Sequence, residues 1–156
     1  MASQASVDIK AAVIREKSGK FLIEDLSLEA PRSDEVLIRV AGVGVCHTDL
    51  VCRDQYFPIP LPCVFGHEGS GIVESVGKSV TKVKPGDRVV LSYLSCGQCE
   101  PCLEHSPGYC HELYDCNFAA TRLDASTTLR KGDEVIHGNF FNQSSDFKNH
   151  TMKHGV

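Results

Sequence analysis

Four cysteines near the middle of the chain constrain its fold more than any other feature of the sequence. Cys96, Cys99 and Cys102 recur with two residues between them, and Cys110 follows after seven more. The segment around them, 95–116, is rich in cysteine, glycine, proline and polar residues and lacks the apolar periodicity of a packed element. We therefore expect a bound metal ion to take the place of a hydrophobic core in this segment.

The spacing of these cysteines indicates a structural zinc site. Two-residue spacing lets successive sulfurs turn toward one ion at about 2.3 Å, and a closed set of four sulfurs leaves no position for water or substrate. Gly97, Pro101 and Gly108 would supply the tight turns between the ligands. Three alternatives stay open: two disulfides, four unligated thiols, or an iron–sulfur cluster, for which two-residue spacings are also typical.

The composition is that of one globular domain. The length of 156 residues suits a single core, and the contents of hydrophobic residues (42%) and charged residues (23%) are close to globular averages. A net charge of -4 without a long basic run argues against nucleic-acid binding. The chain shows neither a secretory signal nor a run of about 20 apolar residues. We therefore expect a soluble, cytoplasmic protein with no membrane span, in which eight cysteines favour metal binding over disulfides.

The N-terminal part of the chain shows the pattern of a mainly β fold. Helix is sparse, and a compact, barrel-like sheet accounts for the alternation of apolar and polar residues. Short runs rich in β-branched residues, separated by turn residues, predict strands at 9–15, 21–28, 35–45, 71–76 and 88–94.

Two connections between these strands have patterns of their own. Residues 48–54 are expected to form a short helix whose first amides Thr48 or Asp49 can cap. The loop at 57–62 contains three alternate prolines, which predicts an extended, exposed segment that shapes the wall of a cleft.

The C-terminal part is predicted to contain one more β segment. Residues 129–141 are expected to form a final hairpin around Gly132 and Asp133, with Val135 and Phe140 facing inward. Residues 148–156 have no periodicity, so we expect a disordered tail.

Two further segments carry groups that bind metal ions. Cys46 and His47 follow a predicted strand, and Gly66-His67-Glu68 precedes another. Each pattern alone is weak, because a Cys-His pair at a strand end more often takes part in ordinary packing. Together with the cysteine segment, however, the chain resembles the zinc-dependent medium-chain alcohol dehydrogenases. The resemblance also includes Gly71, Gly77, Val80 and the run Pro85-Gly86-Asp87-Arg88-Val89.

This resemblance implies a fold and a domain organisation. It predicts a GroES-like irregular barrel, the catalytic domain of the family, over residues 7–147, with a protruding four-cysteine zinc lobe at 95–116. The family's dinucleotide-binding α/β domain is absent, since the sequence has no Gly-x-Gly-x-x-Gly fingerprint. Because the family-like pattern stops near residue 147, we expect a truncated chain that is inactive alone.

The resemblance also assigns the residues of a catalytic zinc site. It makes Cys46 and His67 ligands of the ion, with a third cysteine expected from beyond residue 156. Asp49 would orient His67 through its free ring nitrogen. Glu68 would lie beside the metal as a carboxylate that can approach it during ligand exchange.

The roles of the remaining site residues follow from the same resemblance. Thr48 would hydrogen-bond the alcohol and begin the proton path, and His47 would meet the pyrophosphate of the cofactor, NAD. Val51 stands where some relatives have a histidine that continues this path, so any relay must use water, the cofactor ribose or another group. Phe57 and Tyr93 would line an apolar substrate pocket, although ordinary core packing explains these two side chains equally well.

The implied activity is the oxidation of a small primary alcohol to an aldehyde, with zinc polarising the alcohol oxygen and hydride passing to nicotinamide. The segments 46–49 and 139–141 look most like the aryl-alcohol, or benzyl alcohol, dehydrogenase branch. The full-length enzyme would be a homo-oligomer, either a dimer or a tetramer. The competing hypothesis is a stand-alone structural zinc-binding or interaction module, since four-cysteine lobes also occur in nucleic-acid-binding ribbons.

Overall fold

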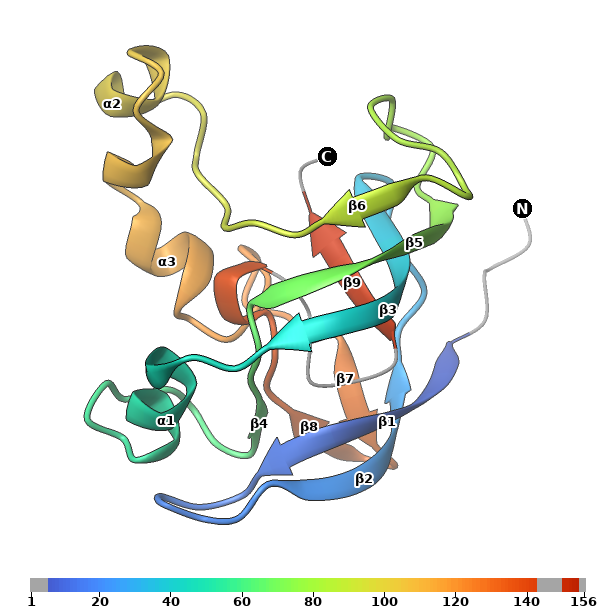
Figure 1. The fold of residues 1–156 in the computed structure, drawn as a ribbon, viewed down its shortest axis with the longest axis vertical. Coiled ribbons are helices and arrows are strands. Elements are labelled where there is room, and N and C mark those ends of the chain that lie inside the picture. Colours follow the sequence, from blue (N-terminus) through green and yellow to red (C-terminus); the bar gives the residue numbers. More distant parts are fainter. Residues whose placement is uncertain (1–5, 143–149, 155–156) are drawn as a thin grey trace.

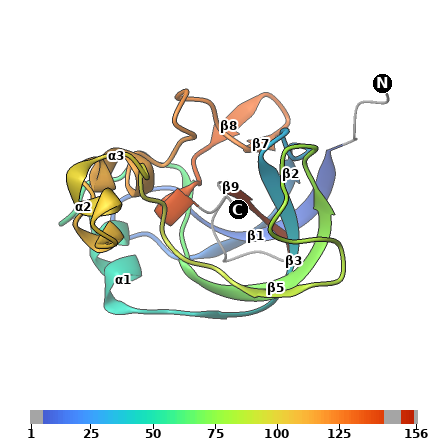
Figure 2. The same ribbon diagram turned by 90° about the horizontal axis from the view of Figure 1, so that it is seen from above.

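The computed structural model describes residues 6–142 and 150–154. Two antiparallel sheets curve around a shared centre, and α1 (His47–Arg53), α2 (Glu100–Leu103) and α3 (Leu113–Asn117) lie together on one side (Figures 1 and 2). The predicted mainly β fold is therefore confirmed, and the described residues contain no dinucleotide-binding α/β sheet. Every helix in this part of the chain falls short of the length and apolarity needed to cross a bilayer.

The first sheet has five strands in the order β4-β1-β2-β7-β8. They are β1 (Val7–Ile14), β2 (Leu22–Leu28), β4 (Cys63–Val64), β7 (Leu129–Lys131) and β8 (Glu134–Ile136). Because side chains along a strand alternate between faces, Ile9, Ala11 and Val13 point inward together. They form one core with Leu26 and Leu28 of β2, and the antiparallel pairing of β1 with β2 confirms the strands predicted at 9–15 and 21–28.

The second sheet has four strands in the order β6-β5-β3-β9. They are β3 (Glu35–Gly44), β5 (Glu68–Val76), β6 (Arg88–Val90) and β9 (His150–His154). The register of the long β3–β5 pairing shifts after Leu37 and after Val40, as at β-bulges, which bend a sheet. The strand predicted at 88–94 ends at Val90, and farther along the backbone N–H of Leu94 pairs with a side chain instead, as described below.

The connection after β3 differs from its prediction in two details. The helix begins one residue earlier than predicted, and Cys46 is its N-cap. The sulfur of Cys46 accepts the backbone N–H of Thr48 at 3.3 Å, while the Asp49 carboxylate returns to the Cys46 N–H at 3.0 Å. In the loop at 57–62, Ile59 is buried rather than exposed, because it packs into the second hydrophobic core.

The hairpin of β7 and β8 buries a different side chain from the predicted one. Ile136 lies opposite the buried Leu129, so both point into the core. Val135 lies opposite Arg130 on the solvent face and is 38% exposed. The prediction for Val135 is therefore wrong by one residue of strand register, which inverts the face. Phe140 is fully buried, as predicted.

The C-terminal residues depart most from the prediction. Disorder is expected over 148–156, yet His150–His154 forms β9, an antiparallel neighbour of β3, and Thr151 is fully buried. The backbone N–H and C=O groups at the edge of a sheet can pair with an added strand that has no hydrophobic pattern. Hydrophobic periodicity therefore does not reveal such a strand. The boundary predicted at residue 147 lies outside the described residues.

A buried ion pair fastens the start of β3 to the chain that follows α3. Arg122 donates from Nε to one oxygen of Glu35 at 2.6 Å and from Nη2 to the other at 3.0 Å. The two side chains are only 6% and 3% exposed. Such bidentate, charge-assisted pairs are both strong and geometrically specific. The pair therefore fixes this junction of the barrel, although no sequence pattern indicates it.

Candidate metal centres

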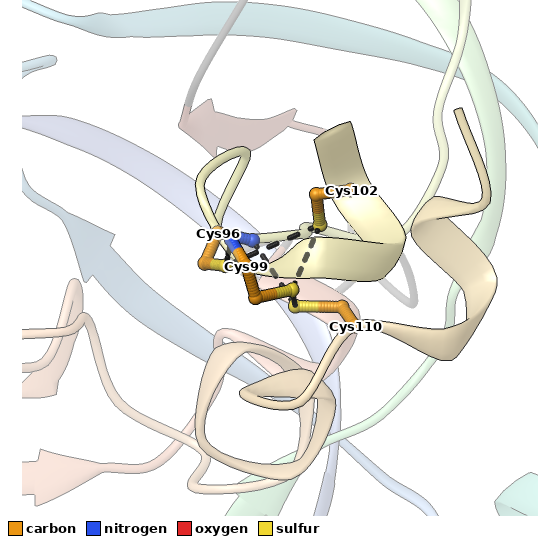
Figure 3. Close-up of side chains that lie close together, drawn as sticks. All are labelled: Cys96, Cys99, Cys102 and Cys110. Carbon is orange, nitrogen blue, oxygen red and sulfur yellow. Dashed lines mark hydrogen bonds between the residues drawn. The ribbon is translucent and has the colours of Figure 1, made fainter. Parts of the chain in front are cut away.

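The four predicted cysteines converge in a lobe that leaves the barrel after β6 (Figures 1 and 3). The Cys99 sulfur lies 3.4 Å from that of Cys102 and 3.9 Å from that of Cys110, and the sulfurs of Cys96 and Cys102 are 4.0 Å apart. Four sulfurs held tetrahedrally at about 2.3 Å from zinc would be separated by roughly 3.8 Å. The arrangement therefore fits a zinc ion, and all eight cysteines are unbridged.

Backbone N–H groups in the lobe point at these sulfurs. Cys96 donates to the sulfur of Cys110 at 3.3 Å, and Cys99 donates to that of Cys96 at 3.4 Å. Gly97 has a φ of +72°, a left-handed conformation that glycine adopts without a side-chain clash. Such donors stabilise the thiolate form that binds zinc. The turn is thus shaped around the ligands.

The thiols of the lobe differ in their acidity. A hydrogen bond from the backbone of His111 is the main cause that lowers the pKa of Cys99 to about 6. Burial, followed by the neighbouring thiols, raises the pKa of Cys102 to about 11. The sulfurs of Cys99 and Cys102 are 3.4 Å apart, so ionisation of one opposes ionisation of the other. A divalent ion would relieve that repulsion.

One buried amide closes the neck of the lobe. Asn117 accepts the backbone N–H of Leu94 at 2.8 Å and donates to the carbonyl of the same residue at 2.8 Å. It also donates to the carbonyl of Leu113 at 2.8 Å, and its exposure is 1%. The side chain thus ties the segment that enters the lobe after β6 to α3, with which the lobe ends. Sequence reasoning does not single out this residue.

The second predicted centre forms where β3 and β5 meet. The strand register pairs Gly44 with Glu68, which brings the residues just beyond these positions together. The sulfur of Cys46 lies 3.3 Å from Nε2 of His67. A tetrahedral zinc ion with a Zn–S distance of about 2.3 Å and a Zn–N distance of about 2.0 Å would hold the two ligand atoms roughly 3.6 Å apart. The predicted convergence of Cys46 and His67 is therefore present.

Asp49 faces the other side of the histidine ring. Its carboxylate is fully buried and accepts the backbone N–H groups of Gly66 at 3.1 Å and Cys46 at 3.0 Å. One oxygen lies 3.3 Å from Nδ1 of His67. A carboxylate on the ring nitrogen that does not meet the metal is the usual device that orients a histidine ligand. This geometry suits orientation of His67 rather than metal ligation by Asp49.

The electrostatics of the pair are complementary. Burial opposes ionisation of Cys46, but hydrogen bonds from the side chain and backbone of Thr48, and then the charge of His67, bring the pKa of the thiol below its ordinary value. Burial likewise opposes protonation of His67, but the hydrogen bond and charge of Asp49 raise the pKa of the imidazole. Thiolate and imidazole therefore stabilise one another.

The other residues predicted for this site lie around α1 and β5. Thr48 is half-buried beside the Cys46 sulfur, and His47 is exposed at the first position of the helix. The side chain of Glu68 lies over Gly44 and occupies the space that a side chain at that position would fill. The functional roles assigned to these residues stay predictions.

The two predicted pocket residues lie in different surroundings. The ring of Phe57 is 4.8 Å from that of Phe118, which in turn is 5.0 Å from that of Phe141, so Phe57 belongs to an aromatic cluster that reaches the metal site. Tyr93 is 39% exposed, and its hydroxyl lies beside Gly108 of the zinc lobe. Their role in binding a substrate stays a prediction.

Two aromatic rings contact His67 that sequence reasoning does not connect with it. Phe141 stacks on the imidazole with ring centroids 4.4 Å apart and planes inclined by 16°. Phe140 meets the imidazole edge-on at 5.4 Å. In the sequence the segment 139–141 is only a point of family resemblance, and no spacing rule links it to position 67.

Comparison with known proteins identifies alcohol dehydrogenases as relatives of this chain. The model of the alcohol dehydrogenase GroES-like domain matches residues 32–122. A geraniol dehydrogenase of Castellaniella defragrans is 50% identical over 144 residues, which are 92% of this chain and 38% of that protein.

Solved structures agree with this match. The crystal structure of an alcohol dehydrogenase zinc-binding domain protein from Burkholderia ambifaria has a TM-score of 0.92 at 45% identity, over 96% of this chain and 40% of that one. That of benzyl alcohol dehydrogenase from Acinetobacter calcoaceticus has a TM-score of 0.88 at 42% identity, over 95% and 39%. The chain thus spans about two fifths of the length of these relatives.

The family match includes strands of the barrel, the segments of Cys46 and His67, and the whole of the zinc lobe, so it does not favour the hypothesis of a stand-alone zinc module. The fold, the four-cysteine lobe and the paired Cys46 and His67 all agree with it. The chain therefore belongs, through its GroES-like domain, to the zinc-dependent medium-chain alcohol dehydrogenase family.

Proposed function

We propose that this chain carries the metal centres of a nicotinamide-linked alcohol dehydrogenase that oxidises primary, aryl-type alcohols to aldehydes. One observation supports this most directly. Cys46 Sγ and His67 Nε2 lie 3.3 Å apart, and the carboxylate of Asp49 stands at the opposite ring nitrogen. This is the donor set of an open zinc site, whereas the closed lobe offers no position for a substrate.

The residues at this site have different proposed roles in binding and positioning the metal ion. Cys46 and His67 would hold a zinc ion, which when bound supplies Lewis-acid chemistry to the alcohol oxygen. Asp49 keeps Nε2 of His67 free for the ion by occupying Nδ1. Glu68 lies on the neighbouring strand, from which its carboxylate can approach the ion during ligand exchange.

Proton transfer and cofactor binding would use the start of α1. The hydroxyl of Thr48 is beside the Cys46 sulfur and would accept the proton of the alcohol as the first step of its path outward. His47 is exposed next to the ligand and would meet the pyrophosphate of NAD. Because Val51 carries no polar group, the path beyond Thr48 must continue through water or the cofactor ribose.

The choice of an aryl substrate is supported by chemistry and by similarity. An aromatic cluster that includes Phe57 and Phe141 reaches His67, and ring-lined sites suit flat apolar substrates. One similar structure is that of a benzyl alcohol dehydrogenase, and another relative is named for geraniol. Tyr93 would add a second wall of the pocket. We further propose a cytoplasmic location, since unbridged cysteines suit a reducing compartment. The homo-oligomer stays an expectation from the family resemblance.

A chimeric enzyme tests the proposal. The chain is joined to the part of the geraniol dehydrogenase relative that lies beyond the aligned region, and NADH formation is followed with benzyl alcohol, geraniol and ethanol. We expect benzyl alcohol to give a higher kcat/KM than ethanol. His67→Asn should abolish turnover, whereas His105→Asn, at an exposed position in the lobe, should leave it unchanged. Full activity of the His67→Asn chimera contradicts the proposal.

The isolated chain provides a second comparison. Of the three groups that converge at the open site, we assign Cys46 and His67 as ligands and Asp49 as the group that orients His67, so we expect one zinc ion to bind tightly in the lobe and a second to bind weakly. We also expect no NAD reduction with benzyl alcohol by this chain alone. Steady turnover by the purified chain would refute that expectation.

A further inference from the structure

The histidine ring of the open site is held on three sides. Phe141 covers one face of the imidazole of His67, with centroids 4.4 Å apart, and Phe140 meets it edge-on. Asp49 stands 3.3 Å from Nδ1. The other ring nitrogen, Nε2, points at the sulfur of Cys46, 3.3 Å away.

Phe141 reaches this place with a disfavoured backbone. Its φ of 54° and ψ of 38° lie in the left-handed region, which a residue with a side chain rarely adopts. This conformation occurs in packed surroundings, because the rings of Phe118 and Phe140 both lie edge-on against Phe141 at 5.0 Å. Strain that is kept beside a reactive site is an observation from which a functional role can be inferred.

We propose that Phe141 is a positioning residue for His67, an inference that rests on the proposed function. The stacked phenyl ring restricts rotation of the imidazole about its bond to Cβ. Nε2 therefore stays directed at the Cys46 sulfur before an ion arrives, and less ordering is needed when it binds.

Electrostatics adds a second contribution from the same contact. The face of a phenyl ring is negative, and an imidazole that donates its Nε2 lone pair to a cation becomes electron-poor. The Phe141 face therefore attracts the metal-bound imidazole more strongly than the free one. Leucine at this position would keep an apolar side chain and the same backbone strain but would lose both contributions.

Zinc titration of the 156-residue chain tests this role. Calorimetry with a competing chelator measures the tight site of the lobe and the weaker site of Cys46 and His67 separately. Phe141→Leu should weaken the second site about ten-fold, as expected when a group that orients a ligand is removed. Phe141→Tyr keeps the ring and should match the wild type. Tyr114→Leu is the control, because its ring contacts are with Phe57 and Phe118.

The possible results separate the two proposals. An unchanged second site in Phe141→Leu, an equal loss in Tyr114→Leu, or a parallel loss at the lobe site overturns the positioning role and leaves the proposed function standing. A wild-type chain that binds no second zinc ion overturns both.

If Phe141→Leu does not fold, nuclear magnetic resonance of the wild-type chain decides. The ring protons of His67, assigned against His67→Gln, should be shifted upfield by the phenyl face. Ordinary chemical shifts for these protons would overturn the proposal.

Discussion

Replacing Arg122 by methionine is expected to destabilise the barrel strongly, because the carboxylate of Glu35 would stay buried without its partner. Methionine has a similar length and no charge, so it removes the guanidinium with little change in packing. Glu35 would keep one donor, the backbone N–H of Arg32 at 2.9 Å. It would lose two hydrogen bonds, at 2.6 and 3.0 Å, in a place where its side chain is 3% exposed.

Two routes to the magnitude agree. Breaking a buried ion pair by removing one partner costs about 3–5 kcal/mol. Two hydrogen bonds to a charged group are worth about 1.5–3 kcal/mol each, or roughly 3–6 kcal/mol together. We therefore expect the free energy of unfolding to fall by about 4 kcal/mol. For a chain of this size this corresponds to a decrease in Tm of roughly 8–16 °C.

Urea unfolding at a fixed zinc concentration, followed by far-ultraviolet circular dichroism, measures this loss. Arg39→Met is the matched control, because Arg39 pairs with Glu74 at the surface, with side chains 50% and 36% exposed. That substitution should cost less than about 1 kcal/mol. Adding Glu35→Leu to Arg122→Met should recover part of the loss, because the unpaired charge is then removed. A loss below 1 kcal/mol in Arg122→Met, or no recovery in the double variant, would refute the reasoning.

Three further predictions concern separate parts of the molecule. Hydrogen bonds from Arg15 are the main cause that lowers the pKa of Glu24 to about 2 from its ordinary 4.5, so this pair stabilises the fold above about pH 4.5 and its contribution is lost as the pH falls toward 2. The difference in unfolding free energy between wild type and Glu24→Gln should therefore shrink over that pH range. A constant difference would contradict the assignment. A methyl group at Gly77 would collide with the backbone at 32–33. Gly77→Ala should therefore lower the free energy of unfolding, measured by denaturant titration, by about 3 kcal/mol or more. An unchanged free energy would show that the two backbone segments can move apart. Cys99→Ser leaves three sulfurs at the lobe. Metal analysis should show loss of the tightly bound zinc, while hydrogen exchange should show that the barrel keeps its strands. Retention of that zinc would contradict four-sulfur coordination.

Much of the fold could be predicted because it depends on near neighbours. The recurrence of Val36, Ile38 and Val40 at every second position marks β3, and the hairpin of β1 and β2 is local. The zinc lobe is also local, since its four ligands lie within one short segment. A short-range pattern carries the information that such elements need, so sequence alone reveals them.

Contacts between distant segments could not be predicted in this way. Arg122 and Glu35 are 87 positions apart, and neither residue type at its position distinguishes a buried pair from two surface charges. The approach of Cys46 and His67 was expected only from the family resemblance, and its physical cause is the strand register that pairs Gly44 with Glu68. The left-handed turn at Phe141 is packed against other aromatic rings, and no local sequence pattern marks it.

The amide of Asn117 has a consequence for how this barrel can change over time. It fastens Leu94 and Leu113 to each other, so the chain leaves and rejoins the domain at one fixed point whatever lies between. The length of the segment between these two residues therefore does not affect the positions of the strands. We therefore expect insertions and deletions in this segment to be tolerated during evolution. A protein engineer could likewise graft a different metal-binding loop between Leu94 and Leu113 without redesigning the sheets.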